Sequence, residues 1–128
     1  MEEENGMGKS VLLIEDEPNI IEAISFILSR DGWTVNTHSN GHDAVDVVHK
    51  SVPDLIILDV MLPGKSGFDI LRELRDSAPT ENVPVLMLTA RGQSKDREMA
   101  ERAGVSRFMT KPFSNSDVLE AVRELVTP

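Results

Sequence analysis

The sequence predicts an α/β fold in which one parallel sheet carries helices on both faces. Short continuous apolar runs alternate five times with longer segments whose apolar residues recur at helical spacing. A run such as Leu55-Ile-Ile-Leu58 is apolar on both faces of its strand, which is typical of a strand buried between two helical layers. Strict alternation of strand and helix favours right-handed crossovers and a parallel sheet. The length of 128 residues and the 40% hydrophobic content suit one such domain.

The expected strands are the apolar runs bounded by turn residues or polar segments. The strongest is Leu55-Ile-Ile-Leu58, which follows the chain-breaking pair Pro53-Asp54, and the weakest begins at Trp33 after a helix-ending glycine. In chain order the five strands are expected at residues 10–14, 33–37, 55–58, 83–88 and 106–110.

Each expected strand is followed by an expected helix. The first begins at Pro18, whose missing N–H costs nothing in a first turn, and ends near Asp31-Gly32. The fourth covers about residues 93–103 with few large apolar side chains, and the last has Ser114 or Asn115 as its N-cap. The apolar stripes of the five helices are Ile20, Ile21, Ile24, Ile27 and Leu28; Ala44, Val45, Val47 and Val48; Phe68, Leu71 and Leu74; Met99, Ala100 and Ala103; and Val118, Leu119, Val122, Leu125 and Val126.

Charge and composition exclude several function classes. Lys and Arg total 13 against 22 for Asp and Glu, and the net charge of −9 argues against nucleic acid binding through a basic face. The absence of cysteine excludes disulfides, thiolate metal sites and a cysteine nucleophile. No apolar run approaches the roughly 18 residues of a membrane span, and no signal peptide pattern precedes the first strand. We therefore expect a cytoplasmic domain over residues 8–127, preceded at 1–7 by a disordered tail or an added prefix.

Acidic, hydroxyl and basic side chains follow four of the expected strands, at the sheet edge where ligands bind in folds of this kind. In chain order they are Glu15, Asp16, Glu17, Asp59, Thr89 and Lys111. Two carboxylates about 4 Å apart repel by roughly 4 kcal/mol at an effective dielectric near 20, so the cluster needs a cation or raised pKa values. Oxygen ligands without His or Cys favour Mg²⁺. Thr89 and Lys111 suit a phosphoryl group, and Asp59 is the best candidate nucleophile.

Taken singly, these residues have ordinary explanations. Glu17 can cap the following helix, Asp59 can be a solvated loop acid, and Lys111 can be a surface lysine. Because four strand ends supply matching residue types, the set favours a shared site. His38 and His42 are four residues apart, but no third ligand follows at a telling spacing, so we interpret them as surface residues.

Four segments together resemble the receiver domain of two-component response regulators, of the chemotaxis-receiver type. They are Val11-Leu-Leu-Ile-Glu15-Asp16-Glu17-Pro18, Leu55-Ile-Ile-Leu-Asp59-Val-Met61-Leu-Pro63-Gly64, Leu88-Thr89-Ala90-Arg91 and Phe108-Met-Thr-Lys111-Pro112-Phe113. The motifs appear in order, and the resemblance covers about residues 9–126. It implies a flavodoxin-like doubly wound sheet with strand order 2-1-3-4-5 and five helices on two faces.

The resemblance also implies a phosphorelay reaction at Asp59. This residue matches the acceptor of a phosphoryl group from a histidine kinase or a histidine phosphotransfer protein. Asp16 and Asp59 match the carboxylates that bind Mg²⁺ directly. Glu15 matches an acid that acts through water, and Met61 matches a position that supplies a backbone carbonyl. The protein would then be a phosphoacceptor that assists its own phosphorylation and dephosphorylation, and not an enzyme with a separate substrate.

The remaining matches concern the phosphoryl group and the switch. Thr89 and Lys111 match residues that contact phosphoryl oxygens, and Phe108 matches an aromatic residue that changes rotamer as Thr89 moves. The Lys111–Pro112 bond matches a peptide bond that is cis in the family. The implied output surface comprises the fourth helix, the fifth strand and the last helix, which would bind an unidentified downstream protein.

One departure from the family pattern bears on assembly. Receivers of winged-helix transcription factors usually carry paired acids just before the switch aromatic, where this chain has Ser106 and Arg107. We therefore expect a monomer. We also expect a stand-alone receiver, with the excised receiver of a winged-helix DNA-binding regulator as the alternative.

Two further function classes are less consistent with the residues. A Mg²⁺-dependent phosphohydrolase of the haloacid-dehalogenase type wants an acid two residues after its aspartate nucleophile, where this chain has Met61. A flavin-binding electron carrier would need a Ser/Thr/Gly-rich phosphate loop after the first strand. This chain has Glu15-Asp-Glu17 there, which repels phosphate unless a metal intervenes.

Overall fold

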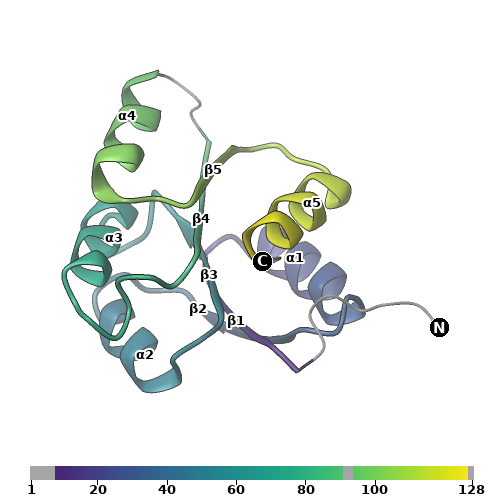
Figure 1. The fold of residues 1–128 in the computed structure, drawn as a ribbon. Helices are drawn as coiled ribbons and strands as arrows, with labels where there is room; N and C mark the ends of the chain where they lie inside the picture. Colours follow the sequence, from purple (N-terminus) through teal and green to yellow (C-terminus); the bar gives the residue numbers. More distant parts are fainter. Residues whose placement is uncertain (1–7, 91–93, 127–128) are drawn as a thin grey trace.

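The computed structural model describes residues 8–90 and 94–126, within which five strands alternate with five helices (Figure 1). The strands are β1 (Ser10–Ile14), β2 (Thr34–His38), β3 (Leu55–Asp59), β4 (Val85–Thr89) and β5 (Arg107–Thr110). The helices are α1 (Pro18–Arg30), α2 (Ala44–Ser51), α3 (Gly67–Arg75), α4 (Ser94–Ala103) and α5 (Asn115–Val126). The tail expected at 1–7, the expected start of α4 at Gln93 and the last residue of the expected domain at 127 lie outside the described residues.

All four strand pairings are parallel, and the sheet order is β2-β1-β3-β4-β5. The flavodoxin-like order 2-1-3-4-5 is therefore confirmed. Helices α1 and α5 cover one face of the sheet, and α2, α3 and α4 cover the other (Figure 1). Within the described residues, no helix combines the length and apolar character that a membrane span needs.

Two hydrophobic cores explain why the strand sequences are continuously apolar. On β3, Ile56 and Leu58 belong to the core under α2, α3 and α4, whereas Leu55 and Ile57 belong to the core under α1 and α5. All four side chains are fully buried. Because successive residues of a strand point to opposite faces, a sheet covered on both sides needs apolar residues at every position.

The way α1 ends explains why β2 begins one residue later than expected. The N–H of Trp33 donates to the carbonyl of Leu28, and the N–H of Gly32 donates to the carbonyl of Ser29, while Gly32 has φ +96°. This is a Schellman arrangement, which closes the last turn of a helix. Trp33 therefore completes the helix end and packs into the core at 4% exposure, and β2 begins one residue later than expected, at Thr34.

The fourth and fifth strands also begin later than expected. The carbonyl of Val83 accepts a 2.7 Å hydrogen bond from Arg75 Nη1, and Pro84 has no N–H to donate, so β4 begins at Val85 instead of Val83. Ser106 donates its N–H to the carbonyl of Val85, and β5 begins at Arg107.

At the start of α5, Ser114 Oγ accepts from the N–H of Asp117, whose carboxylate accepts from the N–H of Ser114. This reciprocal capping selects Ser114 as the N-cap.

The sheet register brings the candidate residues to one edge. Ile14 lies beside Leu58, Asp59 lies beside Leu88, and Thr89 lies beside Thr110. The residues that follow β1 and β5 are therefore neighbours of Asp59 and Thr89 at the carboxyl ends of parallel strands.

Candidate functional site

Three carboxylates form a compact cluster at the carboxyl end of the sheet. One oxygen each from Glu15, Asp16 and Asp59 can be chosen so that all three lie within 4.8 Å of one another. Glu15 and Asp59 are buried, whereas Asp16 is exposed. Glu15 Oε1 is buried, and its nearest opposite charge is Lys111 Nζ at 3.2 Å. Three carboxylates this close together form an oxygen-only donor set, which fits a hard cation such as Mg²⁺.

The main chain after β1 fixes the orientation of Glu15. Its own N–H extends the β1–β2 ladder by donating to the carbonyl of His38 at 3.0 Å. Its Oε2 accepts from the N–H groups of Asp16 at 3.2 Å and Glu17 at 3.1 Å. Burial and the charge of Asp59 raise the pKa of Glu15, although the Glu17 N–H bond and Lys111 lower it in part. The other oxygen stays directed into the cluster.

Asp59 is the last residue of β3 and is 2% exposed. Its Oδ1 accepts a 3.2 Å hydrogen bond from Lys111 Nζ. Burial raises the pKa of Asp59, and the charge and hydrogen bond of Lys111 oppose that shift, as does a backbone hydrogen bond from Met61. The most hydrophobic strand therefore holds a poorly solvated carboxylate beside an ammonium and two other acids.

Lys111 Nζ lies among three carboxylates. The closest oxygen is Glu17 Oε1 at 2.7 Å, whereas Glu15 Oε1 and Asp59 Oδ1 lie at 3.2 Å. Burial lowers the pKa of Lys111, but the hydrogen bond to Glu17 and the charges of Asp59 and Glu15 outweigh it, so the net shift is upward. The ammonium therefore stays protonated. The main-chain N–H of Lys111 donates to the carbonyl of Thr89 at 2.7 Å, which ties the end of β5 to the end of β4.

The other residues that the sequence singled out lie on β4, on β5 and in the segments that follow β3 and β5. Thr89 ends β4 and is 1% exposed. Phe108 lies on β5 beside Met87, two residues before the level of Thr89, and is half-buried. Met61 is 63% exposed. The Lys111–Pro112 peptide bond is cis.

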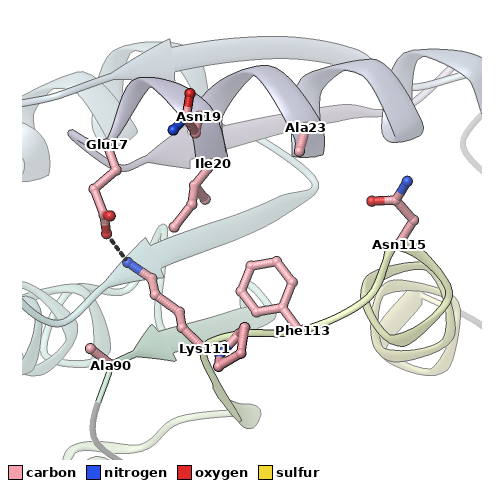
Figure 2. Close-up of a pocket in the computed structure, with 9 residues that line it drawn as sticks. Glu17, Asn19, Ile20, Ala23, Ala90, Lys111, Phe113 and Asn115 are labelled. Carbon is pink, nitrogen blue, oxygen red and sulfur yellow. Dashed lines mark hydrogen bonds and ion pairs between the residues drawn. The ribbon is translucent and has the colours of Figure 1, made fainter.

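Glu17 is the residue whose role the sequence did not reveal. It stands at the N-cap position of α1, but its side chain makes no capping hydrogen bond, so its interpretation as a side-chain cap is wrong. Its carboxylate reaches Lys111 instead (Figure 2). The available signal was the residue type, because helix N-caps prefer Ser, Thr, Asp and Asn, and a glutamate there leaves its side chain for another use.

His38 and His42 do not join the acidic cluster. His38 Nε2 lies 2.7 Å from Asp43 Oδ1, and this contact is the main reason that the pKa of Asp43 is lowered. Over the described residues, the grouping that could hold a metal consists of Glu15, Asp16 and Asp59.

Sequence comparison identifies the family. The model of the response regulator receiver domain family matches residues 11–123, which include the whole acidic cluster and Lys111. The chain belongs to this family. The family match and the observed strand order 2-1-3-4-5 confirm the receiver domain that the sequence motifs predicted.

A curated relative and several solved structures are similar to this receiver domain. The chain is 38% identical over 126 residues to the probable transcriptional regulatory protein TcrX of Mycobacterium tuberculosis, covering 98% of this chain and 53% of that protein. The receiver domain thus spans about half the length of this curated relative. Its fold matches the chemotaxis protein CheY4 of Vibrio cholerae with a TM-score of 0.86 and 26% identity, over 92% of this chain and 98% of that one.

Two further solved receiver domains show the same fold. The receiver domain of the sensor histidine kinase PA1611 from Pseudomonas aeruginosa, solved with a magnesium ion in its active site cleft, matches with a TM-score of 0.85 and 30% identity, over 92% of this chain and 97% of that one. The beryllofluoride-activated receiver domain of RstA from Klebsiella pneumoniae matches with a TM-score of 0.83 and 26% identity, over 93% of this chain and 99% of that one.

Proposed function

We propose that this receiver domain accepts a phosphoryl group on Asp59 from a histidine kinase or a histidine phosphotransfer protein in the cytoplasm. The observation that carries the proposal is the position of Asp59, which is buried at the end of β3 with Lys111 Nζ 3.2 Å from Oδ1 and Glu15 and Asp16 beside it. Phosphoryl transfer depends mainly on positioning and on offsetting charge, and this arrangement provides both.

In the proposed reaction a carboxylate oxygen of Asp59 attacks the phosphorus of the donor. The bond between phosphorus and the donor atom breaks, its electron pair stays on the donor atom, and Asp59 becomes an acyl phosphate. Lys111 offsets charge on the phosphoryl oxygens through its protonated ammonium. Asp16, Asp59 and the backbone carbonyl of Met61, with Glu15 acting through water, would hold a Mg²⁺, which would supply further positive charge. Attack by water on phosphorus later releases inorganic phosphate and restores Asp59.

The phosphorylated side chain carries about −1.5 to −2 charge at the sheet edge, where the free carboxylate carries −1, and local rearrangement transmits that change. We propose that Thr89 contacts a phosphoryl oxygen and moves toward it, and that Phe108 follows. The surface formed by α4, β5 and α5 then binds a downstream protein. Asp59 and Phe108 lie on strands that flank β4, so the proposed route from acceptor to surface crosses one strand.

Incubation with Mg²⁺ and acetyl phosphate tests the acceptor. By intact mass we expect the wild-type protein to gain one phosphoryl group, and Asp59→Ala to gain none. Asp46→Ala, which removes an exposed acid on α2, should behave as wild type. Uptake of phosphate by Asp59→Ala at the wild-type rate would show that the acceptor is another residue.

Calorimetry tests the metal site. We expect weak Mg²⁺ binding in the resting protein and tighter binding with beryllofluoride, because the protein supplies few ligands and the anion adds one. Asp16→Asn should abolish Mg²⁺ binding, and Glu15→Gln should only weaken it. Equal Mg²⁺ affinity with and without beryllofluoride would contradict this site.

A second proposal concerns the output. The relative TcrX is a probable transcriptional regulatory protein, and its similarity over 98% of this chain favours a receiver that serves a DNA-binding regulator over one that acts alone. The complete reading frame distinguishes the two. A basic winged-helix segment in the same frame would support the regulator, and a receiver-only frame would support the stand-alone protein.

A further inference from the structure

The shortest contact of Lys111 Nζ is not with the phosphoacceptor. Glu17 Oε1 lies at 2.7 Å, whereas Asp59 Oδ1 and Glu15 Oε1 lie at 3.2 Å. An ammonium has three N–H donors, and three carboxylates surround this one. A phosphoryl oxygen that binds Lys111 must therefore displace or weaken one of these contacts.

Exposure indicates which contact gives way. The side chain of Glu15 is 0% exposed, and its other oxygen is held by two main-chain N–H groups. Asp59 itself carries the phosphoryl group in the proposed reaction. The side chain of Glu17 is 58% exposed, so its carboxylate can turn into water at little solvation cost.

The local structure leaves Glu17 free to make this movement. The first turn of α1 uses the carbonyl of Glu17, which accepts from the N–H groups of Ile20 and Ile21, and does not use its side chain. The carboxylate lies at the edge of a groove between the start of α1 and the segment that carries Lys111 and Phe113 (Figure 2). Its departure breaks no helix cap.

We propose that Glu17 is a positioning residue that holds Lys111 in the resting state and competes with the phosphoryl group for its ammonium. This inference rests on the proposed function. The same carboxylate also repels the negative charge of the phosphoryl group. Both effects weaken phosphoryl binding, and an ion pair whose carboxylate is open to solvent, as that of Glu17 is, shifts an equilibrium by about two- to fivefold.

Beryllofluoride titration at saturating Mg²⁺, followed by fluorine NMR, tests the competition. We expect Glu17→Gln to bind beryllofluoride about two- to fivefold more tightly than wild type. The matched control is Glu22→Gln, which removes the same charge from an exposed position of α1 and should bind as wild type. Equal affinity of Glu17→Gln and wild type, or an equal gain in Glu22→Gln, would overturn the proposal.

A third variant separates contact from charge. Glu17→Asp keeps the charge, but its side chain is one methylene shorter and is a good N-cap, so it is drawn toward the N–H groups of α1. If contact with Lys111 matters, Glu17→Asp should also bind beryllofluoride more tightly than wild type. Wild-type affinity in Glu17→Asp would show that Glu17 acts through charge alone and would overturn the positioning role.

Kinetics with acetyl phosphate give a second readout. Because Glu17 competes for a group that binds the phosphoryl oxygens, Glu17→Gln should lower KM about two- to fivefold and leave the maximal rate of Asp59 phosphorylation unchanged. An unchanged KM would count against the proposal. If the wild-type protein is phosphorylated on Asp59 but Glu17→Gln has the same KM for acetyl phosphate, only this inference fails. If Asp59 takes up no phosphoryl group at all, the proposed function fails.

Discussion

A Cβ atom on Gly67, the first residue of α3, would lie 2.4 Å from the main-chain oxygen of Asp59. The N–H of Gly67 also donates to the carbonyl of Val60 at 2.9 Å, so the start of α3 is bonded to the chain that leaves β3. Only a hydrogen atom fits between the two segments. Glycine at this position therefore helps to fix the backbone of Asp59, the proposed phosphoacceptor.

Gly67→Ala should destabilise the fold and move Asp59. The methyl group meets backbone atoms, which cannot turn aside as a flexible side chain can, and overpacking of this kind costs about 1–3 kcal/mol. Urea denaturation measures the loss in unfolding free energy. The control Glu98→Ala, on an exposed position of α4, should change stability by less than about 0.5 kcal/mol. Wild-type stability in Gly67→Ala would contradict the close approach.

Asp59→Asn should stabilise the metal-free protein at neutral pH. Burial raises the pKa of Asp59 in the folded protein, so the folded state binds its proton more tightly than the unfolded state does. The ionised carboxylate therefore weakens the fold as pH rises from the ordinary carboxyl range through the raised pKa. We expect a gain on the order of 1 kcal/mol in unfolding free energy.

Urea denaturation in EDTA at neutral pH and near pH 4 checks how the stability difference between Asp59→Asn and wild type changes with pH. The advantage of Asp59→Asn should shrink near pH 4, about the ordinary aspartate pKa, because the raised pKa leaves more of the wild-type carboxyl protonated in the folded state than in the unfolded state there. Asp46→Asn removes an exposed charge and should show no such pH-dependent gain. A gain that persisted undiminished at the lower pH would assign it to another cause.

Helix α4 should exchange its amide hydrogens fastest among the described helices. Its buried side chains are only Asp96, Ala100 and Ala103, and a helix anchored by little apolar area opens at low free energy. Arg97 adds one contact, because its guanidinium carbon lies 5.2 Å from the centre of the Phe108 ring. Hydrogen exchange should also change most in α4 on beryllofluoride binding.

Arg97→Ala tests the contribution of the contact between Arg97 and Phe108 to the stability of α4. A cation–π contact at an exposed site contributes about 0.5–1 kcal/mol, so its loss should speed α4 exchange roughly two- to fivefold. The exchange of α1 should stay at the wild-type rate. If α1 or α2 responded most to beryllofluoride instead, the route through Thr89 and Phe108 would be wrong.

The protein should remain monomeric at micromolar concentration, with and without beryllofluoride. Arg107 forms an ion pair with Glu124 of α5 in the same chain, and Ser106 Oγ accepts from the N–H of Val85 at 2.9 Å. The two positions at which receivers of winged-helix transcription factors usually carry paired acids thus make contacts within this chain. Sedimentation measures the mass, and a tight dimer of the beryllofluoride-bound protein would contradict this prediction.

Much of the fold was determined by local sequence. The apolar run before Asp59 predicted β3, Pro18 predicted the start of α1, and Asp31-Gly32 predicted its end. These signals are readable because strand alternation, helical spacing and a glycine at positive φ depend on residues close together in the chain. The gathering of acids, threonine and lysine at one sheet edge also followed, since parallel strands align their carboxyl ends.

Contacts between distant segments decided the rest. Arg75 of α3 donates to the carbonyls of Val83 and Gly104, which helps to set where β4 begins and links α3 to the chain after α4. Glu17 bonds to Lys111, which lies 94 residues away in the sequence. A side chain of either type has several possible partners of opposite charge or polarity. Which partner it meets depends on how the strands and helices pack, because packing decides which residues far apart in the sequence lie close together in space. The residues next to it in the sequence do not determine this.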